Sequence, residues 1–160
     1  VLMGLGGVAM RPPLEAWPEF PGVRWLTPPD WDVTRPDMAS WAELGDCSML
    51  DLIRSSDVLF TKPGYGAFTE AVCNGTRVLY VERDDWPEEP WLSDWLAEQG
   101  NGVRISRRQL ITGELTEALR TLLDQPARPP LAPTGVDDAV NGLERLLGIA
   151  APGETPCATF

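Results

Sequence analysis

The sequence predicts an α/β domain in which a parallel β-sheet carries helices on both faces. Short apolar runs that are typical of strands alternate with segments of helical apolar spacing, and this alternation indicates β-α-β units. The run at residues 78–81 is continuously apolar, as expected for a strand that a parallel sheet buries on both sides. With 160 residues, the chain has the length of one domain of ordinary size.

The expected strands are short and lie between turn signals. The first strand runs into a glycine turn at residues 4–7, and a later strand is bounded by Asp57 and by Pro63 and Gly64. Residues 27–40 are rich in Pro and Asp, which predicts a surface loop. In chain order, strands are expected at residues 1–3, 23–26, 58–60, 78–81 and 103–105.

The expected helices are recognised by their apolar spacing and by the residues that end them. Prolines between residues 12 and 21 leave room for only a short helix near residues 14–17. A later helix, ended by Gly100, is expected to bury one face made of Trp91, Leu92, Trp95 and Leu96. In chain order, helices are expected at residues 14–17, 49–55, 67–74, 91–99, 115–123 and 136–147. Residues 1–148 are expected to form the domain, and residues 149–160 a flexible tail.

The composition excludes several classes of function. A net charge of −11 disfavours a nucleic acid or an anionic membrane as partner, because both need a basic surface. The chain contains no His, which excludes serine triads, cysteine–histidine proteases and His-based zinc hydrolases within it. The three cysteines, at positions 47, 73 and 157, form no CxxC pair, which favours a reducing cytoplasm over a disulfide framework.

Two further observations concern the chain as a whole. No apolar run approaches the roughly 20 residues of a membrane span, so no transmembrane segment is expected. Val1 stands directly inside a predicted strand. We therefore expect the sequence to be a piece of a longer protein.

The first candidate for chemistry is the glycine turn after the first strand. Gly4, Gly6 and Gly7 would let a ligand approach the backbone closely. The turn lacks the GK[ST] ending of a Walker loop, and it does not complete GxGxxG. A plain tight turn explains the same residues.

The second candidate is the strand, glycine turn and helix at residues 61–70. Free amides of the first helical turn, near Gly66, would form an anion site that the helix dipole reinforces. Lys62 would add positive charge, and Glu70, one turn into the helix, is placed to accept hydrogen bonds from the two hydroxyls of a ribose. The alternative is that Glu70 only complements the helix dipole, which contributes about 0.3–1 kcal/mol.

The third candidate is the acidic loop at residues 82–90, which follows the most apolar strand. Its carboxylates could bind sugar hydroxyls, and Trp86 or Trp91 could stack on a sugar ring. A solvated loop with Glu88 and Glu89 near a helix N-terminus is the alternative. The sequence Asp30-Trp31-Asp32 has the spelling of a DxD metal motif, but it lies in a Pro-rich loop, and we treat it as chance.

These segments together resemble the C-terminal, donor-binding domain of GT-B glycosyltransferases, especially the family 28 type. The stretch SDVLFTKPGYGAFTEA at 56–71 is similar to that family's strand, glycine loop and helix with its glutamate. The stretch VCNGTRVLYV at 72–81 is similar to the element that follows. The sequence is also similar to the transferase-like N-terminal half of arabinokinase-type proteins. The resemblance covers roughly residues 1–123 and is most specific at 56–100.

The resemblance implies a Rossmann-like fold, the C-terminal half of a GT-B fold, and assigns roles to residues. It implies that Glu70 holds the nucleotide ribose and that Asp85, Glu88 and Glu89 hold the donor sugar. The base pocket is expected near residues 24–28 and 47–50. The residues implied to face the diphosphate are Gly6, Gly7, Lys62, Gly64, Tyr65, Gly66, Ala67 and Thr69.

The function implied is the transfer of a hexosyl group from a UDP-sugar to an acceptor. The resemblance places the acceptor site and the catalytic base on an N-terminal domain of the same protein, so the isolated chain is expected to be inactive. No metal and no cofactor are expected beyond the nucleotide sugar itself. The alternative is a non-catalytic, sugar-nucleotide-binding module that regulates or docks a partner, and a third possibility is a Rossmann-like interaction domain without a ligand.

Overall fold

The computed structural model describes residues 1–6 and 11–148, and its centre is a six-stranded parallel sheet. The strand order is β3-β2-β1-β4-β5-β6. The strands are β1 Leu2–Gly4, β2 Trp25–Thr27, β3 Met38–Ser40, β4 Val58–Thr61, β5 Arg77–Val81 and β6 Gly102–Ile105. The prediction of a Rossmann-like α/β fold is confirmed.

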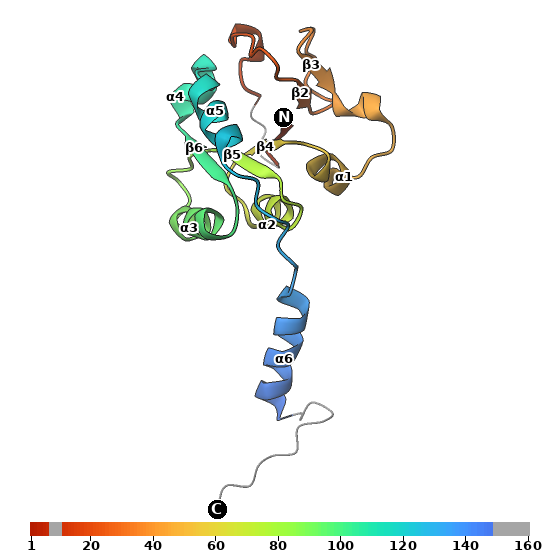
Figure 1. The fold of residues 1–160 in the computed structure, drawn as a ribbon, viewed down its shortest axis with the longest axis vertical. Coiled ribbons are helices and arrows are strands. Elements are labelled where there is room, and N and C mark those ends of the chain that lie inside the picture. The colour runs from red at the N-terminus through yellow and green to blue at the C-terminus, as the bar shows by residue number, and fades with distance from the viewer. Residues whose placement is uncertain (7–10, 149–160) are drawn as a thin grey trace, which may run out of the picture.

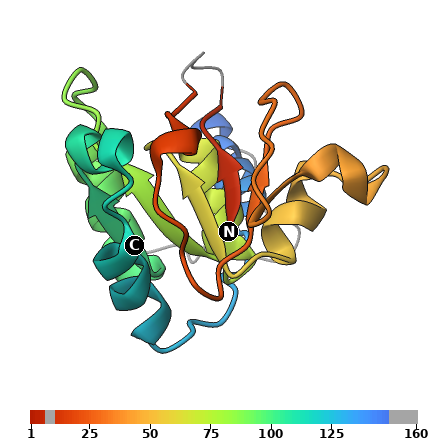
Figure 2. The same cartoon turned by 90° about the horizontal axis from the view of Figure 1, so that it is seen from above.

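The order of the strands reverses between β1 and β4. The chain places β2 and β3 on one side of β1 and then crosses over to place β4, β5 and β6 on the other side. The direction of winding therefore reverses between β1 and β4. Figure 2 shows β1, in red, beside β4, in yellow, near the middle of the sheet. In open parallel sheets, ligands bind beyond the carboxyl ends of the strands at such a reversal.

Helices cover both faces of the sheet, as the sequence predicts. They are η1 Leu14–Ala16, η2 Trp41–Leu44, α1 Met49–Arg54, α2 Tyr65–Cys73, α3 Glu89–Gln99, α4 Arg107–Thr112, α5 Thr116–Asp124 and α6 Gly135–Leu147. The first three α-helices pack on one face, against a core that includes Leu59 and Val78. η1, α4 and α5 pack on the other face, against a core that includes Phe60 and Leu79 (Figure 1). Neighbouring residues of one strand thus serve opposite cores, because successive side chains of a strand alternate between faces.

The prediction of a loop over residues 27–40 is wrong in part, because β3 lies within that stretch. β3 is a three-residue edge strand that pairs with β2, with Trp25 opposite Met38. The corner before it is held by Arg35, which donates to the carbonyls of Leu14, at 2.7 Å, and Trp17, at 2.6 Å. These contacts join residues that are far apart in the sequence, so the local Pro-rich sequence does not predict the strand.

Two helices differ from the prediction. α4 is absent from the predicted set, although Ser106 and Gln109 form a reciprocal capping box at its start. α3 begins at Glu89 and not at Trp91, and Trp91 is 72% exposed. The expectation that Trp91 shares a buried face with Leu92 and Leu96 is therefore wrong, since only the two leucines are buried. The two leucines lie one turn apart, and Trp95, which is partly buried, packs against the same core, so three of the four predicted residues do share a face.

α6 stands apart from the rest of the molecule (Figure 1). None of its residues is buried. The segment before it is held to the domain, because Leu131 N donates to Val72 O at 3.1 Å and Arg128 donates to carbonyls at the end of α3. The tail predicted at residues 149–160 lies outside the described residues. Within the described part of the chain, no helix is long and apolar enough to cross a membrane.

Candidate functional site

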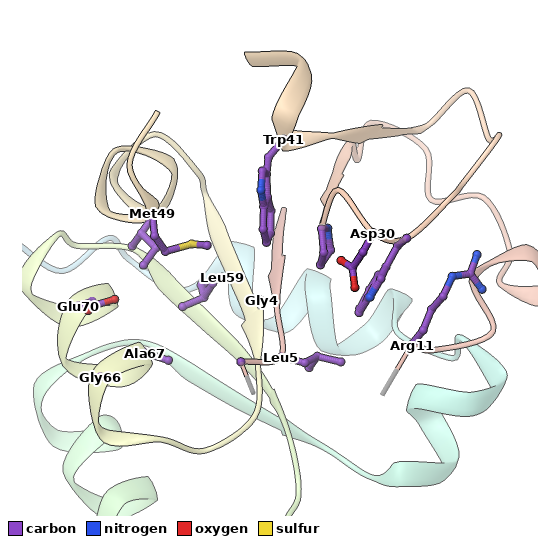
Figure 3. Close-up of a pocket in the computed structure, with 14 residues that line it drawn as sticks. Gly4, Leu5, Arg11, Asp30, Trp41, Met49, Leu59, Gly66, Ala67 and Glu70 are labelled. Carbon is purple, nitrogen blue, oxygen red and sulfur yellow. The ribbon is translucent and has the colours of Figure 1, made fainter. Parts of the chain in front are cut away.

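A cavity of about 740 Å³ opens at the carboxyl ends of the strands, where β1 and β4 meet. Its walls come from the turn after β1, the loop after β2, the start of η2, and the helices α1 and α2 (Figure 3). The cavity has the size of ordinary small-molecule sites. Its position is the one that the strand order predicts for a ligand.

Glu70 lies in the wall of this cavity and comes from the second turn of α2. Its side chain is half-buried, and Figure 3 shows it directed toward the cavity. Among the described residues, no side chain or amide forms a hydrogen bond or an ion pair with its carboxylate. A carboxylate in this position can accept hydrogen bonds from a ligand that carries hydroxyl groups.

The N-terminus of α2 forms the next part of the same wall. Gly64 is its N-cap, and no side chain caps the helix. Gly66 and Ala67, in the first turn, both line the cavity. A Cβ placed on Gly66 would meet nothing within 4 Å, so the first turn of this helix faces open space. Amides at an uncapped helix start attract anions, because the helix dipole adds to their own partial charge.

The turn after β1 faces the turn after β4. Gly6 adopts a φ of +61° and lines the cavity, and the side chain of Lys62 lies over it. The Oγ1 of Thr61 donates a hydrogen bond to the carbonyl of Gly4 at 2.7 Å, which ties the two strand ends together. The structure therefore brings Gly6, Lys62 and the start of α2 to one edge of the sheet. Gly7 lies outside the described residues.

Tyr65 and Thr69 lie on the outer side of α2 and do not line the cavity. The Oγ1 of Thr69 donates back to the carbonyl of Tyr65 at 2.7 Å. The Tyr65 hydroxyl donates to Glu88 at 2.8 Å, and this hydrogen bond raises the pKa of the tyrosine. The ring of Tyr65 also packs edge-on against Trp86, with centroids 5.7 Å apart.

The three acidic residues predicted for the donor sugar lie outside this cavity, in and beside the loop after β5. Glu89 is buried, with 6% exposure, and it accepts a hydrogen bond from Arg83 N at 2.5 Å and pairs with Arg104 at 3.2 Å. Asp85 is exposed and lies near the guanidinium groups of Arg83 and Arg107. Of the three, Glu88 is the one linked to α2, through Tyr65. Their role in sugar binding stays a prediction.

The outer wall of the cavity contains residues that the sequence analysis did not select. Trp41, at the start of η2, and Asp30, in the loop after β2, both line it. Pro28 and Met49 line it as well, and these two fall within the segments expected for the base pocket. Trp41 follows β3 directly, and a residue at the carboxyl end of a strand is a candidate for a ligand site. It could have been selected on that ground only if β3 had been predicted.

The described residues contain no group of three His, Cys, Asp or Glu side chains that could hold a metal ion. Asp30 and Asp32 are therefore not joined there by a third such group. Cys47 and Cys73 are free thiols. The expectation that no metal is required stays a prediction.

Comparison with known proteins found partial similarities, and no family model matches the chain. The chain is 38% identical over 69 residues to L-arabinokinase of Arabidopsis thaliana, and the matched region covers 43% of this chain and 7% of that protein. It is 27% identical over 77 residues to an uncharacterized glycosyltransferase of Methanopyrus kandleri, and the matched region covers 48% of this chain and 22% of that protein. The matches span less than a quarter of either relative. The chain is thus a Rossmann-like α/β domain with partial similarity to a protein named as a glycosyltransferase.

Proposed function

We propose that the chain is the nucleotide-sugar-binding half of a glycosyltransferase of the GT-B, family 28-like type. The observation that carries this proposal is that Glu70 and the open first turn of α2 face one cavity at the reversal point of the sheet. The partial similarity to a protein named as a glycosyltransferase supports the same conclusion.

The arrangement fits a nucleoside diphosphate in one orientation. The diphosphate lies against the amides of Gly66 and Ala67, where the helix dipole and the cation of Lys62 offset its charge. The ribose then lies one turn further along α2, where its hydroxyls donate to Glu70. The base extends toward Trp41 and Met49, which supply apolar surface. Each part of the ligand thereby meets a wall of matching chemistry.

The reaction is the transfer of a hexosyl group from the nucleotide to an acceptor oxygen. The bond between the sugar and the diphosphate breaks, a bond to the acceptor oxygen forms, and the acceptor proton goes to a base. This chain would stabilise the departing diphosphate through the start of α2, without a metal. The resemblance stated above implies that the base and the acceptor site belong to an N-terminal domain, and that the donor is a UDP-sugar.

A non-catalytic module that binds sugar nucleotides and regulates a partner is the second candidate. The match to L-arabinokinase favours it, because the matched region is 7% of a protein named as a kinase. Both candidates predict nucleotide binding. They differ in whether the full-length protein transfers sugar to an acceptor, which a transfer assay with labelled nucleotide sugars measures.

Calorimetric titration of the chain with UDP and GDP tests the proposed function. We expect binding of a nucleoside diphosphate, and Glu70→Ala should weaken it about tenfold or more because two hydrogen bonds to a charged acceptor are lost. Glu98→Ala is the matched control, since Glu98 is an exposed glutamate that does not line the cavity. Equal affinities for the wild type and Glu70→Ala would remove the ribose role, and absence of binding would remove the proposed function.

A further inference from the structure

Asp30 stands at the end of the cavity that the diphosphate and ribose leave open. It comes from the loop after β2, and its side chain is exposed to the cavity. Figure 3 shows its carboxylate directed into the cavity, on the side where Trp41 lies. Among the described residues, nothing forms a hydrogen bond or an ion pair with this carboxylate. The nearby Arg11 is engaged elsewhere, by Glu15 and by the carbonyl of Asp32 at 3.1 Å.

The surfaces around Asp30 are flat or apolar. Trp41, Pro28 and Trp31 line this end of the cavity, and Met49 lines the side toward α2. Aromatic rings and proline are surfaces on which a planar heterocycle stacks. A planar group inserted here from the ribose position would lie between apolar walls and present its edge to a carboxylate.

We propose that Asp30 selects the base of the nucleotide and favours guanine over uracil, and guanine thereby replaces the uracil of the UDP-sugar that the resemblance implies. The inference rests on the proposed function, because the position of the base follows from the ribose at Glu70. Guanine carries two neighbouring donors on one edge, the ring N1–H and the N2 amino group, and the two oxygens of one carboxylate can accept both. Hydrogen bonds to an ionised acceptor are stronger than neutral ones.

The other bases fit this edge less well. Uracil offers a single N3–H that lies between two carbonyl oxygens, and these oxygens are repelled by a carboxylate. Adenine offers its N6 amino group beside an acceptor nitrogen, so one carboxylate oxygen would face a lone pair. Hypoxanthine, the base of inosine, keeps the N1–H and lacks the amino group. The affinity for IDP therefore measures the contribution of the N1–H hydrogen bond without that of the amino group.

The test is a titration of the intact chain with GDP, IDP, ADP and UDP, in which tryptophan fluorescence or calorimetry measures binding. We expect GDP to bind about tenfold more tightly than UDP, with IDP in between. A factor of about ten is at the lower end of the discrimination that a bidentate pair of hydrogen bonds gives, because Asp30 is exposed to water. Asp30→Asn should remove most of this ratio, because it weakens the binding of GDP and relieves the repulsion of the uracil oxygens in UDP. Asp32→Asn is the matched control, because Asp32 is an exposed aspartate two residues away that does not line the cavity.

The outcomes separate this inference from the proposed function. If UDP binds as tightly as GDP, or if Asp30→Asn keeps the ratio, Asp30 does not select the base, while binding that depends on Glu70 leaves the proposed function intact. If no nucleoside diphosphate binds to the wild type, both the inference and the proposed function are overturned.

Discussion

Lys62 lies over the glycine turn that follows β1, with its Nζ 3.7 Å from the position that a Cβ on Gly6 would take. Lys62 is the single lysine of a chain that carries a net charge of −11. Its ammonium group stands beside a turn that lines the cavity, and it comes from the turn that leads into α2. A cation in this place offsets the electrostatic repulsion between the acidic protein and an anionic ligand.

We therefore predict that Lys62→Gln weakens the binding of a nucleoside diphosphate by about threefold to tenfold, since one charge-assisted hydrogen bond is lost. Lys62→Arg should keep most of the affinity, because the positive charge remains. Calorimetry at low and high salt measures both variants. The wild type should lose affinity as salt rises, and Lys62→Gln should respond less to salt. An unchanged affinity in Lys62→Gln would show that the cation does not reach the ligand.

Substitutions at Gly66 and Gly6, two of the glycines that line the cavity, are expected to change stability in opposite directions. Gly66→Ala places a methyl group where no atom lies within 4 Å, inside a helix, and should stabilise the fold by about 0.5–1 kcal/mol. The same methyl group occupies the space in front of the first turn of α2, so binding of the diphosphate should weaken.

Gly6→Ala is the companion variant, because Gly6 has a φ of +61° and alanine there should cost about 1 kcal/mol of stability. Urea unfolding and calorimetry on both variants give the four values. A Gly66→Ala protein that is more stable and binds nucleotide normally would contradict the assignment of this helix start to the diphosphate.

The sequence predicted the inner half of the site because that half follows from local rules. Strands and helices are separated by Gly and Pro, so β1, β4 and α2 were found, and with them Gly6, Gly66 and Glu70. The helix start needs no long-range information, since an exposed glycine turn before an apolar helix is a local pattern.

The outer half of the site could not be predicted in the same way. Trp41 and Asp30 reach the cavity because β3 pairs with β2 at the sheet edge, and that pairing depends on Arg35 contacts with distant carbonyls. The acidic loop shows the same limit. Glu88 and Glu89 are neighbours of identical type, and the early start of α3 decides that Glu89 is buried and ion-paired.

Glu89 is predicted to act on stability. Glu89→Ala should lower the free energy of unfolding by about 1–3 kcal/mol, because it leaves the part-buried amide of Arg83 without its acceptor. It also removes the nearest of the three carboxylates that pair with the guanidinium of Arg104. Glu88→Ala should cost less than about 0.5 kcal/mol, since it removes a hydrogen bond between exposed groups. Urea denaturation measures both. Equal losses in the two variants would contradict the structural role of Glu89, and a loss of sugar-nucleotide affinity confined to Glu88→Ala would leave that residue as the sugar ligand.

Asp37 is predicted to make stability depend on pH in the acid range. The hydrogen bond from Arg35 holds the pKa of this carboxyl below its usual range in the folded protein, and the same arginine fixes the corner before β3. A folded pKa below the unfolded value means that the contribution is present above the unfolded pKa of about 3.9. It is lost as the pH falls through the folded pKa.

Asp37→Asn should therefore lower the free energy of unfolding by about 1–2 kcal/mol at neutral pH, because the ion pair is partly buried. The difference between wild type and variant should shrink steadily below about pH 4, where the wild-type carboxyl also becomes neutral. Urea denaturation across this range gives the two curves, with Asp94→Asn as an exposed control that forms no ion pair among the described residues. A difference that stays constant down to low pH would mean that Asp37 acts through its shape and not through its charge.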